Sequence, residues 1–507
     1  MFDAFNRRRA LALGGSLFGG SFLASLKLPH LAAAELALPA GSVQFRPEIE
    51  PLVRIIEETP SERVLGAVAS EIRGGRSYRE CLAALFLAAI RNVQPRPAVG
   101  FKFHSVLVVN SAHLASLAGA DDERWLPLFW AIDYFKRAQK QDIAEGNWTM
   151  SAVDETRVPD AAKALNDLRA ALENWDVESA DVAAAAAARA ASAHQLFDLF
   201  AEFGSRDFRS IGHKAIYVAG AFRVLQVIGW ENSEPVMRSL AYALLNHTGD
   251  PNPAKSDLAV DRQGRLNRDR ATDLPVGWFA GKVDSSATND LLQTARGASP
   301  EAMAVETAKL FQRGVGITSV YDGLFASSAE LIMRQPAIVP LHAMTTTNAM
   351  HYLVQHVHND SLRRWLVLQN AAFIGHFREA ADGRGNLEPH RIDDVVKASE
   401  ERSAGEAAPV ESLFDGGGKQ ANERATDFLA FLRSGGSPMQ LMAQARHLVF
   451  HKGNDSHDYK YSSAILEDYF ARSPEWRDQI LAAGSALFPS TDKRDTGLAT
   501  RVAQAFS

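Results

Sequence analysis

The sequence predicts an all-α fold built from packed helical hairpins. Helical periodicity of apolar residues recurs along most of the 507-residue chain, and no series of alternating apolar and polar residues predicts strands. With 46% hydrophobic and 22% charged residues, the composition is that of a globular protein. It excludes a polytopic membrane protein, a collagen-like fibre and a mostly disordered chain. Two architectures fit this pattern, an irregular α-solenoid or a single helical domain.

The predicted helices are amphipathic and are bounded by Pro, Gly or acidic residues. A run of alanines from 183 to 188 predicts one long, closely packed helix over Glu178–Phe200. Two polar segments, 248–300 and 380–420, predict long loops, which are either functional lids or disordered. The earlier part of the chain predicts helices over Arg46–Glu57, Ser61–Ile72, Tyr78–Arg91 and Trp125–Gln139.

Residues 1–34 predict a twin-arginine signal peptide with cleavage after Ala34. Consecutive arginines at 7–9 precede an apolar stretch over 10–26, and small residues follow at 32–34. The alternatives are an uncleaved anchor or an arginine-rich signal for the general secretory route. We therefore expect a periplasmic or secreted domain over 35–507, with the Tat translocase as its partner during export and no stable membrane association. Because that route carries folded proteins, it favours a redox or metal enzyme.

Charge and cysteine content narrow the function classes. The net charge is −6, so nucleic acid is a poor partner and a small-molecule substrate is expected. The single cysteine, Cys81, excludes an internal disulfide and any cysteine-based zinc or iron–sulfur site.

Three predicted hairpins open with a histidine at the start of their first helix: His104, His213 and His342. In the first and third, an Asn and a His follow at offsets of six and nine residues. This pattern is either an internal repeat or a coincidence among alanine-rich helices. The residues at these offsets are Asn110, His113, Asn348 and His351.

The three helix-start histidines are candidate metal ligands. A spacing of nine residues turns a side chain by about 180°, so two histidines of one helix cannot share an ion. His104, His213 and His342 converge if the hairpins direct the same end at one cavity. Neutral imidazoles can then bind Fe, Cu or Zn, or act as general bases. The alternative is that they cap helices or lie hydrogen-bonded in the core. His447 and His451, four residues apart, form a second candidate metal pair.

Three helix entries combine several polar groups and predict pocket walls. They contain His213 with Arg209, His342 with Thr345, and His457 with Lys460. In the predicted mechanism His213 and His342 are ligands or general bases, and His457 transfers a proton. Lys460 and Arg209 would stabilise an enolate or peroxide anion. Each entry is also an acceptable helix cap.

Short motifs in a shared order resemble the questin oxidase-like family. They are Val109–Leu114, Gly212–Ile216, Leu341–Thr345 and Asp455–Lys460, spread over roughly residues 100–470. The resemblance implies an all-helical fold and Baeyer–Villiger-like oxidation of a quinone or other aromatic ring with O2 and NADPH. The chain departs from the family at Ser111, where the family has a His, and His113 or His104 is the candidate replacement. Export also removes a ready supply of NADPH. Carried over residue by residue, the resemblance points to Asn110, His213, His342, Thr345, His457 and Lys460.

The sequence therefore predicts an exported oxidoreductase, an oxygenase with a histidine-lined pocket. The alternatives are a non-catalytic helical-repeat binding protein and an exported metal-binding protein. An enzyme requires His213, His342 and His457 in one pocket, whereas a scaffold would leave them scattered. A metal-storage protein would instead group His447, His451 and His457.

Overall fold

The computed structural model describes residues 38–39, 41–95, 100–245, 250–403, 409–416 and 418–507. Within these ranges the chain forms 22 α-helices, and its only β-structure is two isolated bridges. The predicted all-α fold is confirmed. None of the described helices is both long and apolar enough to cross a membrane. The predicted signal peptide lies outside the described residues.

The four early helices occur close to their predicted positions. They are α2 (Glu50–Glu58), α3 (Val64–Arg73), α4 (Tyr78–Asn92) and α6 (Leu126–Ala144). The start of α4 is sharply defined because Ser77 and Glu80 form a capping box there.

The predicted long helix over Glu178–Phe200 is wrong, because the chain breaks after the alanine run. Helix α8 (Val177–Ala190) ends there, and α9 (Ala193–Ser205) begins after a second capping box made by Ser192 and Gln195. Local capping chemistry thus interrupts a segment of high helix propensity. The buried alanines let α8 pack closely against α7 (Ala164–Asn174) and α11 (Ser233–Leu245).

The two predicted long loops both contain helices. Polar side chains hide the periodicity of these helices, which bury only a narrow apolar face. At the start of α13, the Asp284 carboxylate accepts hydrogen bonds from the backbone of Ser286 and Ala287. The first segment holds α12 (Ala259–Thr272), α13 (Ser285–Ala295) and the start of α14 (Pro300–Gln312); the second holds the end of α17 (Asp360–Asp382) and all of α18 (Ile392–Arg402), before α19 (Ala421–Arg433).

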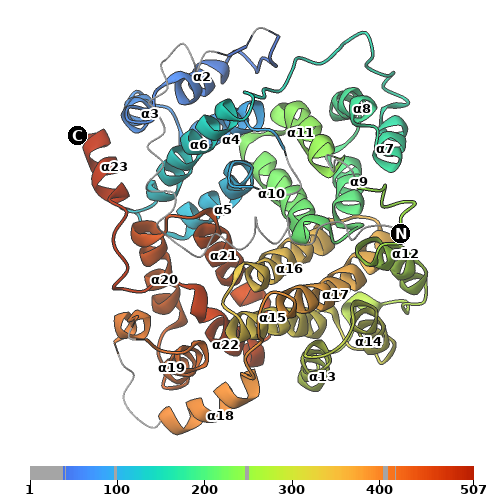
Figure 1. The fold of residues 1–507 in the computed structure, drawn as a ribbon, viewed down its shortest axis with the longest axis vertical. Helices are drawn as coiled ribbons and strands as arrows, with labels where there is room; N and C mark the ends of the chain where they lie inside the picture. Colours follow the sequence, from blue (N-terminus) through green and yellow to red (C-terminus); the bar gives the residue numbers. More distant parts are fainter. Residues whose placement is uncertain (1–37, 40, 96–99, 246–249, 404–408, 417) are drawn as a thin grey trace, which may run out of the picture.

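Four helices form a ring near the middle of the molecule, and each packs against the next (Figure 1). They are α5 (His104–Ala118), α10 (His213–Ile228), α16 (Ile338–His356) and α21 (Ser456–Glu467). We call this ring the central bundle. The three predicted hairpins occur as α5 with α6, α10 with α11 and α16 with α17. Helix α21 joins them as a fourth member.

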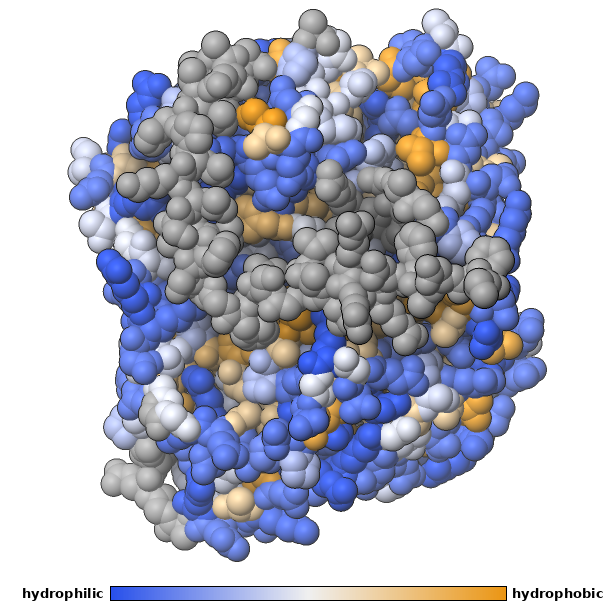
Figure 2. Space-filling view, viewed as in Figure 1, coloured by the Kyte–Doolittle hydropathy of each residue, from blue (hydrophilic) through white to orange (hydrophobic). Residues whose placement is uncertain are grey.

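The other helices surround the central bundle, and the last helix packs on one of the first described helices. The C-terminal α23 (Leu498–Phe506) packs on α3, so the helices close on themselves and do not form an open solenoid (Figure 1). Figure 2 shows one face, where the coloured surface is largely hydrophilic with scattered apolar side chains. The remaining helices are α15 (Ile317–Arg334), α20 (Pro438–Lys452) and α22 (Pro474–Ala483).

Candidate metal centre

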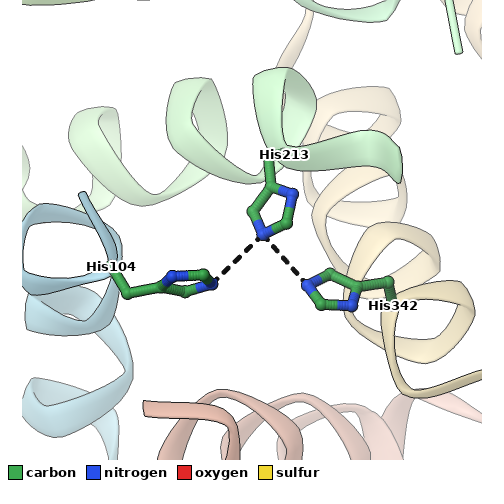
Figure 3. A group of neighbouring side chains, drawn as sticks. All are labelled: His104, His213 and His342. Carbon is green, nitrogen blue, oxygen red and sulfur yellow. Dashed lines mark hydrogen bonds between the residues drawn. The ribbon is translucent and has the colours of Figure 1, made fainter. Parts of the chain in front are cut away.

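His104, His213 and His342 meet between the starts of three helices of the central bundle (Figure 3). The Nε2 atom of His213 lies 3.3 Å from Nε2 of His104 and 3.0 Å from Nε2 of His342. All three side chains are buried, and His342 is only 1% exposed. The three helix-start histidines thus come together as a shared site requires. We call them the histidine cluster.

The hydrogen bonds at the outer ring nitrogens, the Nδ1 atoms, determine the protonation of the inner ring nitrogens, the Nε2 atoms. Each Nδ1 atom faces a backbone carbonyl, which can only accept, so Nδ1 carries the proton. In a neutral imidazole the Nε2 atom then presents a lone pair. The contacts drawn in Figure 3 therefore bring lone pairs together, and a cation bound between them would relieve the repulsion. The carbonyls belong to Gly100 (3.0 Å), Ser210 (2.7 Å) and Ile338 (2.7 Å).

The spacing of these nitrogens fits a coordinated transition-metal ion. With metal–nitrogen bonds of about 2.0–2.1 Å, ligand nitrogens lie about 2.9 Å apart at right angles and about 3.3 Å apart at tetrahedral angles. The two separations from His213, 3.0 and 3.3 Å, lie in that range, and all three ligand nitrogens lie within 4.8 Å of one another. Carbonyl partners on Nδ1 are the outer contacts that metal-binding histidines usually have. Three imidazoles suit Fe, Cu or Zn.

His457, at the start of α21, adds a fourth imidazole beside the cluster. Its ring centre lies 4.7 Å from that of His104 and 5.1 Å from that of His342. Its Nδ1 atom contacts the Asp455 carboxylate at 2.5 Å, and its buried Nε2 has no hydrogen-bond partner within the described part of the chain. Burial raises the pKa of Asp455, but the hydrogen bonds and positive charge of His457, together with the charge of Lys460, outweigh it and lower the value to about 2. His457 is therefore held ready as a further ligand or a proton carrier.

Burial keeps the histidine cluster neutral. It lowers the pKa of His104, His213 and His342 well below the usual value, and the nearby Lys460 lowers each further. The Lys460 Nζ atom lies 3.4 Å from Nε2 of His213. Burial also lowers the pKa of Lys460, to about 7. Because neutral imidazole is the form that binds metal, these shifts favour coordination at neutral pH.

A strained turn positions His213. Ser210 and Ile211 have φ angles of 56° and 44°, which side chains rarely adopt, and Gly212 follows at 80°. A Cβ on Gly212 would lie 2.0 Å from Oγ1 of Thr346, so only glycine fits. The turn aims the Ser210 carbonyl at His213. Strain of this kind persists where the surroundings enforce it and is often found at functional sites.

Arg209 is one of the groups that hold this turn, which differs from its predicted role. Its guanidinium forms a bidentate ion pair with Asp261 of α12 and a third contact with Asp250. Lys214 is likewise paired with Asp207. The stabilisation of an enolate or peroxide by Arg209 stays a prediction, and the structure shows its charge paired with two carboxylates at the turn. The sequence shows the charges but not their long-range partner in α12.

Two cavities lie between the helices of the central bundle beyond the cluster. The inner cavity, of about 30 Å³, is lined by Thr345, Lys460 and Asn110 among others. The outer cavity, of about 330 Å³, is lined by Asn110 and Arg223 together with groups such as His351 and Glu467. Asn110 and Arg223 line both cavities, and no described residue forms a hydrogen bond with the buried Oδ1 atom of Asn110.

The cavities are lined by residues that follow the four histidines at the same sequence offsets. The four helices therefore run in the same direction from the cluster. This register explains why Asn and His recur at offsets of six and nine in the first and third hairpins. Thr345, His457 and Lys460 were predicted to line a pocket. The membership of α21 in the same ring, the ion pair of Arg223 with Glu467 and the remaining lining residues were not recognised in the sequence. Spacings of three, seven and ten after each histidine would have revealed them. Offset three holds Leu107, Ile216, Thr345 and Lys460; offset seven holds Ser111, Gly220, Ala349 and Ala464; offset ten holds Leu114, Arg223, Tyr352 and Glu467.

His447 and His451 form a separate group on the molecular surface. One oxygen of Glu123 lies 2.7 Å from a ring nitrogen of each. We call these three residues the surface group. His457 is not part of it but lies beside the histidine cluster, so the predicted grouping of His447, His451 and His457 is wrong. Glu123 was missed because it is over 300 residues away in the sequence.

His113, a candidate replacement for the family's histidine, lies away from the cluster. Its Nδ1 atom contacts the hydroxyl of Tyr78 at 3.1 Å, and its side chain lines the outer cavity. His104, the other candidate, belongs to the cluster. Comparisons with protein-family models, curated proteins and solved structures find no match for this chain.

Proposed function

We propose that this protein is an oxidoreductase that binds one transition-metal ion through His104, His213 and His342. The observation that carries the proposal is the meeting of three Nε2 lone pairs, each fixed by a carbonyl at Nδ1. In the free protein these lone pairs repel one another, and an ion would turn that repulsion into coordination. Fe and Cu supply redox chemistry when bound to such imidazoles.

The chain's own residues support a reaction beside this site. Lys460 is buried at the inner cavity, where its ammonium can stabilise a developing negative charge. His457, oriented by Asp455, can hold or release a proton at Nε2. The Asn110 side chain lines both cavities, and a rotation of its amide would turn the buried Oδ1 atom toward a bound molecule as a hydrogen-bond acceptor.

The resemblance to the questin oxidase-like family supports the same class of reaction. The residues that it points to all belong to the central bundle, either in the cluster, beside it or at the inner cavity. We accordingly propose a quinone-like or aromatic substrate, for which the outer cavity has room, with O2 as oxidant. We also propose an exported location for the mature protein.

The deciding experiment is the metal content of the exported protein, measured beside a His213→Ala/His342→Ala double variant. We expect about one equivalent of Fe or Cu in the wild type and none in the variant. O2 uptake in the presence of quinones would then test the reaction. A correctly folded wild-type protein that neither carries nor takes up metal would overturn the proposal.

The surface group favours a second candidate function, binding or storage of metal without catalysis. Its two imidazoles and one carboxylate can also ligate a divalent ion. A storage protein would release this metal readily and show no metal-dependent O2 uptake. Metal content and O2 uptake measured together therefore separate the two functions.

A further inference from the structure

The two cavities of the central bundle differ in size and in access to the histidine cluster. The inner cavity reaches Thr345 and Lys460, one turn beyond His342 and His457, whereas the outer cavity reaches neither. Offsets of six to ten residues from the histidines correspond to about 9–15 Å along a helix. A molecule in the outer cavity is therefore separated from the cluster by the length of the inner one.

We propose that the inner cavity is the route to the metal and that it admits only molecules of two or three heavy atoms. A ring-sized substrate is retained in the outer cavity. This inference rests on the proposed metal site and adds the class of molecule that reaches it: a diatomic or triatomic ligand, never an aromatic ring.

The volume of the inner cavity sets the size limit. At about 30 Å³ it has space for one or two water-sized molecules. Its walls at offset seven are small residues, Gly220, Ala349 and Ala464, so the available space exists because side chains are short there. The helices around it are well packed, so a larger molecule would have to displace the backbone.

An ion pair limits passage between the two cavities. Both oxygens of Glu467 lie 2.7 Å from Nη1 of Arg223, and Asn348 donates a further hydrogen bond to the same carboxylate. Arg223 lines both cavities, so its side chain lies between them. The proposal therefore requires that a small molecule pass beside Asn110 while this pair stays intact, and that a ring be stopped there.

Gly220 offers a way to close the inner cavity without disturbing the fold. A Cβ at this position would contact only the Cβ of Asn110, at an ordinary 3.5 Å. Because Gly220 lies inside a helix, alanine should stabilise the protein slightly. Gly66 is the matched control, since it is also helical, would contact nothing within 4 Å and lies in α3, away from the bundle.

The test measures azide binding to the cobalt-loaded protein by absorption spectroscopy, after metal content has been determined for each variant. We expect Gly220→Ala and Gly220→Val to slow azide binding progressively, by at least about tenfold for valine, with metal content unchanged. Gly66→Ala should bind azide like the wild type. Imidazole, with five ring atoms, should leave the wild-type spectrum unchanged at concentrations where azide saturates.

Failure of this inference is distinguishable from failure of the metal site. Metal bound normally, with azide binding as fast in Gly220→Val as in the wild type, overturns the inference alone, as does ready binding of imidazole. Crystals under krypton pressure add a readout that needs no metal. Krypton should occupy the inner cavity of the wild type and not that of Gly220→Val, and its absence from the wild type would overturn the route even if no metal binds.

Discussion

The histidine cluster and the surface group have similar ligand atoms but differ in how many hydrogen-bond donors and acceptors meet there. In the surface group the Glu123 oxygen accepts from both imidazoles, so the group is satisfied by protons alone. In the cluster the inner nitrogens have lone pairs, and among the described residues only Lys460 offers them a proton. An ion at the surface must displace hydrogen bonds, whereas an ion in the cluster relieves repulsion. Proximity of ligands is therefore a weaker indication of a metal site than the count of their donors and acceptors.

Burial adds to this difference. The cluster is enclosed by helices, and its outer nitrogens are fixed by carbonyls, so little entropy is lost when a ligand binds. The His447 side chain is 49% exposed and keeps its mobility. We expect the cluster to bind metal first and to retain it longer.

The largest expected effect is on metal affinity, and it should appear at the histidine cluster in one variant and at the surface group in the other. His342→Ala should lower the affinity of the cluster by more than about 100-fold, since even outer partners of metal ligands cost about 10–100-fold. His447→Ala should leave that affinity unchanged and remove only a weaker second binding event. Calorimetric titration of the metal-free proteins measures both. Loss of the tighter event in His447→Ala would reverse the comparison.

Much of the cluster was predictable from sequence. Histidines at the helix starts of successive hairpins meet if those helix starts lie at the same end of the bundle. The meeting of His104, His213 and His342 follows from that pattern once the helices are parallel. Arg209 and Glu123 could not be assigned in this way. Their partners Asp261 and His451 are fixed by tertiary packing, and nothing local distinguishes a paired charge from a free one. Polar helices such as α12 were predicted as loops for a related reason. Tertiary packing stabilises them, and their sequences show little apolar periodicity.

The strained turn gives the next largest effect. Gly212→Ala should destabilise the protein by about 2–4 kcal/mol, the sum of left-handed strain and overpacking against Thr346. Gly277→Ala is a matched control, because Gly277 has nearly the same φ, 78°, with nothing within 4 Å of its Cβ position. Denaturant unfolding measures both. Equal losses in the two variants would show that contact with Thr346 adds nothing.

A buried histidine outside both sites shows what burial alone does to an imidazole that belongs to no group of histidines. His376 stacks on Phe208, and its Nε2 atom has no hydrogen-bond partner among the residues that the structure describes. Burial lowers its pKa to about 4, so below pH 6.5 the unfolded chain binds a proton that the folded protein refuses. Stability is therefore lost as the pH falls from 6.5 towards 4.

His376→Leu should remove this part of the acid sensitivity. Relative to the wild type, the variant should gain about 2 kcal/mol between pH 7.5 and pH 5, at about 1.4 kcal/mol per pH unit below 6.5. Its metal content should not change. Unfolding curves at the two pH values test the expectation, and parallel losses in both proteins would contradict it.

The smallest effect is the change in metal affinity caused by the charged neighbour of each site. These two neighbours carry charges of opposite sign. Lys460 lies beside the cluster and disfavours a cation there, whereas Glu123 attracts one to the surface. Lys460→Met should raise the metal affinity of the cluster by about tenfold, and Glu123→Gln should lower that of the surface group by a similar factor. Added salt should reduce the Glu123 effect more, because exposed charges are screened and buried ones are not.

A buried cation retained beside a metal site costs affinity, so its presence needs a compensating role. If Lys460→Met binds metal more tightly but loses O2 uptake, the lysine serves the reaction and the cluster differs from the surface group in kind. If the affinity stays the same, the charge of Lys460 is not felt at the cluster, and the electrostatic part of the comparison fails. Competition titrations at two salt concentrations, paired with O2 uptake, distinguish these outcomes.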